Sequence, residues 1–192
     1  VLPDNRYTAV YGAEADERVR AGAYRADDNQ TWRYWAGNVS ITKEVWDRIG
    51  PYDDHYQAYG WEDVDYGWRL HQAGIPIVVD PALATRHHAA AVSTLARVSR
   101  SYRSGQARRT FDEIHGPGTS GAVRPVDDSM WNQLVCSTVP HLSYRRSHAL
   151  AKSVDAALPG IPAPVARKAI ALLVEASGIA GYETTETAER DF

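Results

Sequence analysis

The strongest constraint on how this chain folds comes from residues 59–70, which read YGWEDVDYGWRL. Two adjacent carboxylates, Glu62 and Asp63, follow a glycine and a tryptophan, and a third carboxylate, Asp65, comes two residues later. Apolar residues recur after them at helical spacing and a glycine then follows, so the pattern predicts a helix over residues 61–73. The carboxylates therefore belong to its first turn, where the helix dipole and unpaired N–H groups favour negative charge.

On these residues alone, more than one role is open for the carboxylates. They fit a purely structural helix start, and they equally fit a general base that takes the proton of a hydroxyl group. Asp63-Val64-Asp65 also has the spacing of a two-carboxylate metal motif. That motif is expected where an apolar strand ends, whereas this one lies inside a helical pattern, which argues against it. Asp65 and Arg69 are spaced for an ion pair along the helix, so Asp65 is expected to be structural.

Strand-like and helix-like segments alternate in the first part of the chain. Beta-branched and aromatic residues predict strands at 7–11, 31–41, 75–79 and 82–86. Helical patterns cover residues 42–49, 61–73, 89–115, 129–138, 142–157 and 163–177. A segment rich in glycine and proline begins at residue 116, so we expect a domain at 1–115 and a helical C-terminal extension at 116–192.

Composition narrows the functional class. The chain has 192 residues and 44% of them are hydrophobic, which is enough for a buried core. A net charge of −3 gives no electrostatic case for binding nucleic acid. The single cysteine, Cys136, excludes an internal disulfide framework and fits a reducing, cytoplasmic setting. No apolar run approaches the ~20 residues that span a bilayer.

Three further features carry possible functions. The tandem pair His87-His88 follows a predicted strand, and histidine is a frequent metal ligand as well as a frequent surface residue. Gly37-Asn38 lies inside a predicted strand, where a glycine marks a close approach by another backbone or a ligand. Arginines spaced along Arg97–Arg109 form a basic helix face. Such a face is commonly solvated, and the alternative is peripheral contact with an anionic membrane, ligand or partner.

Taken as a series, these segments resemble a known protein family. They are WAGNVSITK at 35–43, WDRIG at 46–50, the 59–70 stretch, GIPI at 74–77 and His87. Their order and spacing resemble the C-terminal half of inverting GT-A glycosyltransferases, most closely glycosyltransferase family 2 and the galactosyltransferase C-terminal region. The resemblance covers about residues 30–90 and implies the C-terminal part of a Rossmann-like α/β domain, followed here by the helical extension.

The resemblance implies transfer of a sugar from a nucleotide-sugar donor to a glycan or other hydroxyl acceptor, with inversion at the sugar. In that comparison Asp63 matches the catalytic base. Glu62 matches the neighbour that binds sugar hydroxyls, and Gly60 and Trp61 match the wall of the sugar pocket.

The resemblance also implies donor and metal contacts. Gly37, with Asn38 beside it, matches backbone close to the donor. His87 matches a ligand of Mn²⁺ or Mg²⁺, and His88 takes that role if the alignment shifts by one residue. The metal would offset the charge on the departing nucleoside diphosphate.

One part of the resembled family has no counterpart here. Nothing in residues 1–58 fits the nucleotide-binding half, and Asp27-Asp28 lacks both the motif spacing and the apolar strand before it. We therefore expect that half upstream in the same polypeptide or in a partner chain. The alternative is a non-catalytic module that binds glycans, or serves as a scaffold or docking element, and has kept only the shape.

Overall fold

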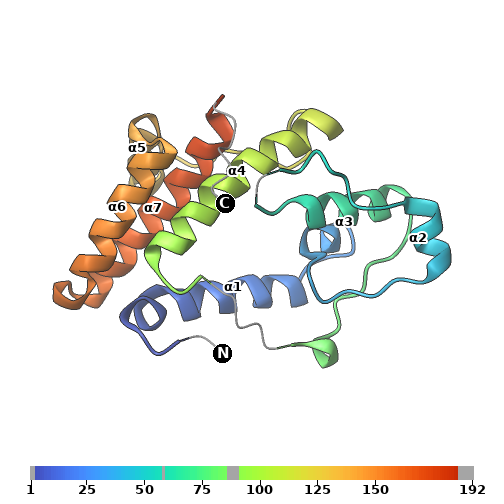
Figure 1. Cartoon of the computed structure of the whole chain (residues 1–192), viewed down its shortest axis with the longest axis horizontal. Coiled ribbons are helices and arrows are strands. Elements are labelled where there is room, and N and C mark those ends of the chain that lie inside the picture. Colours follow the sequence, from blue (N-terminus) through green and yellow to red (C-terminus); the bar gives the residue numbers. More distant parts are fainter. Residues whose placement is uncertain (1–2, 58, 86–90, 186–192) are drawn as a thin grey trace.

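The structure, a computed structural model, describes residues 3–57, 59–85 and 91–185, and every regular element in them is helical. Helices α4 to α7 gather on one side of the molecule, α2 and α3 lie on the other, and α1 runs beneath (Figure 1). Short turns of π-helix (η1) or 3-10 helix (η2 to η5) join them. The elements are η1 (Thr8–Gly12), α1 (Ala13–Tyr24), η2 (Thr31–Tyr34), α2 (Lys43–Ile49), α3 (Glu62–Gln72), η3 (Pro81–Leu83), α4 (Thr94–His115), α5 (Met130–Thr138), η4 (Val139–His141), α6 (Tyr144–Ala157), η5 (Leu158–Gly160) and α7 (Ala163–Glu183).

The predicted α/β, Rossmann-like fold is wrong, because no β-strand occurs in the described part of the chain. Residues prone to β-structure form a strand only where a neighbouring strand pairs with their main-chain groups. Residues 39–42 and 75–80 form neither helix nor strand, and no strand pairs with them among the described residues. Residues 31–34 form η2 and residues 81–83 form η3, which are turns of 3-10 helix.

The segment predicted as the first strand is helical for a packing reason. Tyr7 and Val10 are each 3% exposed, and their spacing of three places them on one face of a helical turn. That face packs against side chains from the end of the chain, namely Leu158, Ala166 and Ile170. Tertiary burial therefore decides the conformation here, against the local β-propensity.

A helix occurs in each of the six segments predicted to be helical, and side-chain caps fix most of their starts. Helix α4 begins at Thr94 rather than at residue 89, and α1 was not predicted. The Thr42 hydroxyl accepts a hydrogen bond from the Val45 N–H at 3.3 Å, and Gly50 ends α2 with φ at 84°. Serines 93, 129 and 143 cap α4, α5 and α6 in the same way. Helix α4 runs through the glycine at 105 without a break. Helix α7 extends to residue 183, beyond the predicted end at 177.

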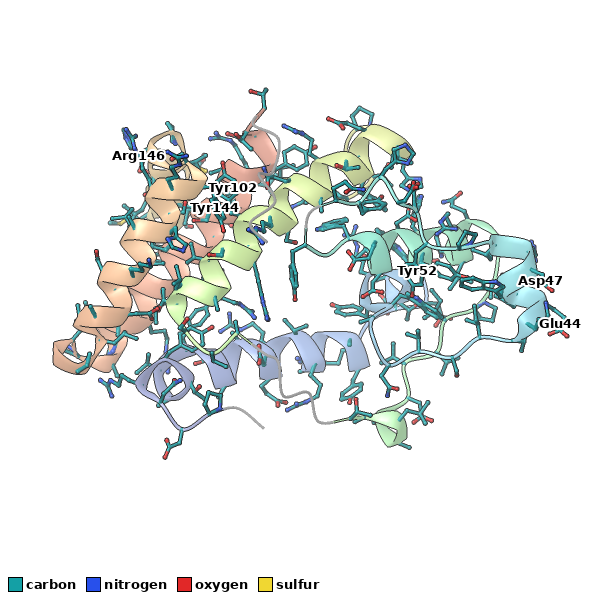
Figure 2. All side chains as sticks on the ribbon, viewed as in Figure 1. Glu44, Asp47, Tyr52, Tyr102, Tyr144 and Arg146 are labelled. Atoms are coloured by element: carbon teal, nitrogen blue, oxygen red, sulfur yellow. The ribbon has the colours of Figure 1, made fainter. Side chains whose placement is uncertain are left out.

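Helices α4 and α7 pack unusually closely, because glycines line their contact. A Cβ at Gly105 would lie 2.1 Å from the Gly178 carbonyl oxygen, and one at Gly181 would lie 2.0 Å from that of Tyr102. The Tyr102 ring also lies 5.6 Å from that of Tyr144 on α6, with both labelled in Figure 2. The core of this helical bundle thus draws on α4 to α7 together.

A second, smaller core supports α3. Tyr66 and Leu70 are 0% and 1% exposed, and the Tyr66 ring stacks on Trp35 with 5.7 Å between ring centroids. Gly67 allows α3 to touch η2, since a Cβ there would lie 2.2 Å from the Trp32 carbonyl oxygen. The packing of α3 therefore fixes the position of the helix whose first turn holds the carboxylates.

Helix α4 packs on α6 and α7, so the predicted boundary at residue 115/116 falls between elements that share a core, and the two-domain division stays a prediction. Its arginines contact the chain itself. Arg97 pairs with Asp16 at 3.3 Å, and Arg108 donates to the Ser120 hydroxyl at 2.8 Å. Membrane contact through the Arg97–Arg109 face stays a prediction. None of the helices described here combines the length and apolarity needed to cross a bilayer.

Candidate active site

The candidate site is the first turn of α3 and the two residues before it. Gly60 and Trp61 both have left-handed backbone conformations, with φ at 80° and 73°. Trp61 is the one residue other than glycine with a positive φ in the described ranges. Glu62 and Asp63 follow directly, so both carboxylates lie at the positive end of the helix dipole. The structure thus brings together four of the predicted site residues.

Asp63 is half-buried, and burial raises the pKa of its carboxyl group. A hydrogen bond from the Tyr52 hydroxyl opposes this rise in pKa. The Tyr52 oxygen in turn accepts a hydrogen bond from the Trp35 indole N–H at 3.1 Å, and Tyr52 lies beside α3 in Figure 2. Asp63 is therefore more basic than an exposed aspartate, which is a property that a general base needs.

Glu62 has a different environment. It is half-buried, and its Oε2 atom is buried with no hydrogen-bond partner among the described residues. Burial raises the pKa of Glu62, a backbone hydrogen bond lowers it, and the neighbouring charge of Asp63 raises it further. A buried carboxylate oxygen without a partner is costly unless a donor reaches it. A hydroxyl group of a bound ligand would supply such a donor.

Asp65 is structural, as the sequence predicted. Its side chain is 1% exposed, and Arg69 donates to its Oδ2 atom at 2.8 Å in the predicted pair. Its Oδ1 atom lies 2.7 Å from His115 Nε2 and accepts a hydrogen bond from the Tyr56 hydroxyl at 3.2 Å. With both oxygens occupied in this way, Asp65 is poorly placed to hold a metal together with Asp63.

Gly60 and Trp61 lie against α4, an element that sequence reasoning had not connected with them. The Trp61 indole N–H donates to the Ser104 hydroxyl at 3.1 Å. The Trp61 ring lies 5.1 Å from the ring of Phe111, between centroids. The predicted wall of a sugar pocket is thus a tryptophan whose side chain is held on one face by a helix.

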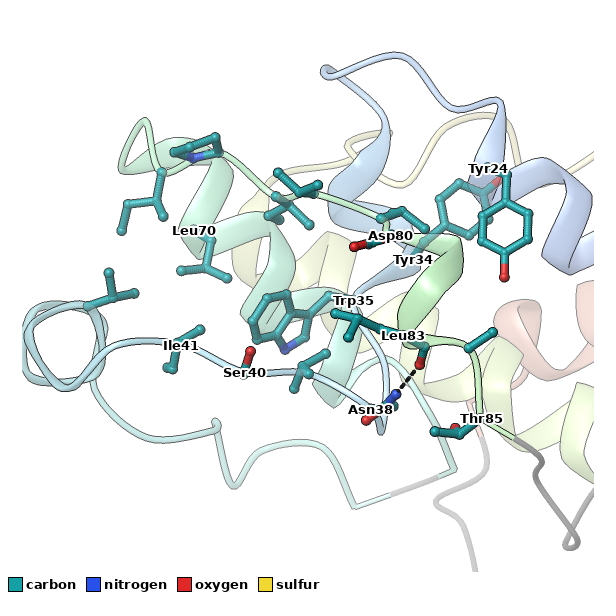
Figure 3. A pocket seen from close by; sticks show the side chains of 18 of the residues that line it. Tyr24, Tyr34, Trp35, Asn38, Ser40, Ile41, Leu70, Asp80, Leu83 and Thr85 are labelled. Carbon is teal, nitrogen blue, oxygen red and sulfur yellow. Dashed lines mark hydrogen bonds between the residues drawn. The ribbon is translucent and has the colours of Figure 1, made fainter.

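Gly37 and Asn38 lie apart from the carboxylates. Asn38 donates to the Leu83 carbonyl at 2.7 Å and lines a cavity of about 740 Å³ between residues 38–45 and 75–85 (Figure 3). Glu62 and Asp63 are not among its lining residues, but Trp35 is, and its indole joins the cavity to the Tyr52–Asp63 pair. A Cβ at Gly37 would meet no described atom within 4 Å, so its own chain does not require a glycine there.

The predicted metal ligands, His87 and His88, lie outside the described residues. Within the described part, Asp53, Asp54 and His55 form the one group of three possible ligands. His55 is exposed, and its Nδ1 lies 2.6 Å from an Asp53 oxygen, so this group reads as a solvated surface turn. No described set of donors beside Asp63 fits a divalent ion, and we route no chemical step through one.

Sequence reasoning missed Tyr52, Ser104 and His115. Tyr52 stands in a loop rich in aromatic and acidic residues, where no periodicity singles out one tyrosine. Ser104 and His115 lie on a helix whose arginines dominated its interpretation. Their spacing of eleven residues, about three helical turns, is the signal that they share a face.

Part of the chain is similar to proteins of known families. Residues 18–90 match the model of a family described as the N-terminal domain of galactosyltransferase. The match includes Gly37, Asn38 and the whole first turn of α3, so the chain contains a glycosyltransferase-like domain. The description names an N-terminal domain, and it therefore does not support the expectation that these residues form a C-terminal half.

Two curated relatives carry the comparison to individual proteins. Both are named validoxylamine A glucosyltransferase, from Streptomyces hygroscopicus subsp. jinggangensis (strain 5008) and subsp. limoneus. Each is 37% identical over an alignment of 68 residues, and the match covers 32% of this chain. The chain spans 16% and 15% of the length of these relatives. No solved structure matches the chain.

Proposed function

We propose that this chain carries the acceptor-activating part of an inverting, metal-assisted glycosyltransferase that moves a hexose from a nucleotide-sugar to a hydroxyl group. The observation that carries the proposal is the carboxylate pair in the first turn of α3. Asp63 is half-buried and has a raised pKa, and Glu62 beside it presents a buried oxygen without a partner among the described residues. The likeness to proteins named for galactosyl and glucosyl transfer supports the choice of a hexose.

In the proposed reaction, the acceptor hydroxyl oxygen attacks the anomeric carbon while an Asp63 oxygen takes the hydroxyl proton. The bond from the anomeric carbon to the phosphate oxygen breaks, and the electron pair leaves with the nucleoside diphosphate. A single displacement inverts the anomeric configuration, so one base is sufficient. A basic group near neutral pH serves this step best, which fits the direction of the Asp63 pKa.

Glu62 is proposed to bind rather than to react. Its Oε2 atom accepts a hydrogen bond from a sugar hydroxyl, which satisfies the unpaired buried oxygen. Trp61 presents an aromatic ring beside it, and an aromatic face packs well against the apolar C–H face of a sugar.

We further propose that a nucleotide-binding part, elsewhere in the same polypeptide or in a partner chain, completes the enzyme. Val78 and Leu83 are 83% and 62% exposed beside the cavity described above. No described residue makes a main-chain hydrogen bond with residues 76–79. An extended apolar segment of the nucleotide-binding part would cover these two side chains and pair with the main-chain groups of residues 76–79. The metal, Mn²⁺ or Mg²⁺, is proposed to bind through His87.

The test of this function is the substitution Asp63→Asn in the full-length protein, with a nucleotide-hexose donor and a panel of hydroxyl acceptors. Transfer should fall by about 100-fold or more while donor affinity is unchanged, because only proton removal is lost. Asp47→Asn is the matched control, since Asp47 lies on α2 in an exposed pair with Lys43. Transfer by Asp63→Asn at the rate of this control would refute the assignment of the base.

A further inference from the structure

Helix α4, which begins after the segment that matches the glycosyltransferase family, touches the candidate site along one continuous stripe. The stripe consists of Ser104, Arg108, Phe111 and His115. Successive spacings of four, three and four residues place all four side chains on one face of the helix. All four contact a single five-residue segment, from Trp61 to Asp65. Figure 1 shows the end of α4 extending from the bundle toward α3.

The upper end of this contact fixes Trp61. A non-glycine residue in the left-handed conformation costs about 1–2 kcal/mol and persists where its surroundings determine it. Here the indole N–H donates to Ser104 at 3.1 Å, and the ring packs at 5.1 Å from the ring of Phe111. The Arg108 guanidinium lies 5.8 Å from the indole centroid. Contacts from α4 thus hold the strained backbone at Trp61, where the chain enters α3.

The lower end of the contact fixes Asp65. His115 Nε2 lies 2.7 Å from Asp65 Oδ1, and the carboxylate is buried. Arg69 holds the other oxygen of the same carboxylate. A hydrogen bond between largely buried partners holds the two side chains in a fixed geometry.

Glu62 and Asp63 stand between these two fixed points, at a rise of about 1.5 Å per residue. We propose that Ser104 and His115 are positioning residues, which hold the first turn of α3 so that the carboxylate pair keeps its reactive orientation. The inference rests on the proposed function. Neither side chain touches a reacting atom in this assignment, because each acts through its partner, Trp61 or Asp65.

A merely structural role would make every part of the fold less stable, whereas a positioning role acts on one turn. Two other sets of contacts already hold α3 in place. Gly67 packs against η2, and Tyr66 and Leu70 are buried in the smaller core. Loss of the His115 contact should therefore loosen the first turn and leave the rest of α3 packed.

The experiment compares His115→Leu with His115→Gln in the full-length protein, at a temperature where both are folded. His115→Leu should lower kcat by about ten- to a hundredfold with KM within about twofold, because a small misplacement of a reacting group costs that much. His115→Gln, whose Nε2 can still donate to Asp65, should recover most of the loss. His148→Leu, on α6, is the control for a general loss of stability.

Hydrogen exchange gives a readout that is independent of activity. The Asp65 N–H donates to the Trp61 carbonyl at 2.7 Å, and its exchange should quicken in His115→Leu while exchange in α6 and α7 is unchanged. Where His115→Leu does not fold, Ser104→Ala against Ser104→Thr takes its place with the same expectations.

Equal kcat for His115→Leu and His148→Leu, failure of glutamine to rescue, or uniform quickening of exchange would each overturn the inference. If Asp63→Asn is inactive while the His115 variants are normal, only the positioning role is refuted. If Asp63→Asn remains active, the proposed function itself is refuted, and the exchange result then decides whether α4 still holds the turn.

Discussion

Replacing Gly67 by alanine tests the close packing of α3 against η2 most directly. In an isolated helix this change stabilises by about 1 kcal/mol, because glycine is a poor helix former. In the folded protein the new Cβ would lie 2.2 Å from the Trp32 carbonyl oxygen and 2.9 Å from the Trp35 Cβ. The Trp32 oxygen is main chain and cannot turn away, so α3 and η2 must separate by about 1 Å.

Overpacking of this kind costs about 1–3 kcal/mol, and the absence of a flexible neighbour points to the upper end of that range. After the helix-propensity gain is subtracted, we expect a net loss of about 2 kcal/mol in the free energy of unfolding. For a chain of this size that lowers Tm by about 4–8 °C. Urea unfolding and a thermal scan of the purified protein measure both quantities.

Gly22→Ala is the matched control. Gly22 also lies inside a helix, but the nearest atoms to its Cβ would all belong to the Tyr34 side chain, with the hydroxyl at 2.9 Å, and that side chain can move. The control should be neutral or up to about 1 kcal/mol more stable than wild type. A Gly67→Ala protein as stable as the control would refute the close contact between α3 and η2.

Three further predictions concern the site and its surroundings. Burial raises the pKa of Asp63 above its unfolded value, so the wild type loses stability as pH rises between those two values; Asp63→Asn should be the more stable protein in urea at about pH 7, with the advantage gone near pH 4. In the full-length protein, Val78→Asp should lower Tm if the nucleotide-binding part covers this residue. Val126→Asp, at a position 94% exposed, is the control and should leave Tm unchanged. Equal effects of the two substitutions would refute the contact between Val78 and the nucleotide-binding part. Titration with Mn²⁺ should show weaker binding by His87→Ala and normal binding by His55→Ala, and unchanged affinity in the first variant removes His87 from the metal.

Helices α2 to α7 were predictable from the sequence because their signals are local, whereas α1 (Ala13–Tyr24) was not predicted. Thr42 and Gly50 mark the ends of α2 by cap chemistry that acts within one turn. The strands failed because a strand depends on a partner that no local pattern reveals. Tyr7 and Val10 have strand-like neighbours, yet they are buried against residues more than 140 positions away. Residues 75–80 show the same limit, since no strand in the described chain pairs with their β-prone sequence.

In the candidate site too, the local features were predictable and the long-range contacts were not. Glu62 and Asp63 were predicted in the first turn of a helix, and the structure places them there. The pairing of Asp65 with Arg69 was predicted from their spacing and is confirmed. His115 could not be predicted as the second partner of Asp65, because it lies 50 positions further along the chain. Only packing brings such distant polar groups together, and no motif spans that interval.

The stripe on α4 has a consequence for how this protein can vary in length. An α-helix turns by about 100° per residue, so one residue inserted between Ser104 and His115 would rotate the histidine away from Asp65. An insertion next to Gly105 would also move this glycine away from its close contact with Gly178 on α7. A point substitution on α4 disturbs the contacts of one side chain, whereas an insertion or deletion shifts every contact beyond it at once. Natural variation in length is therefore expected in the turn after residue 115 and not within the helix itself.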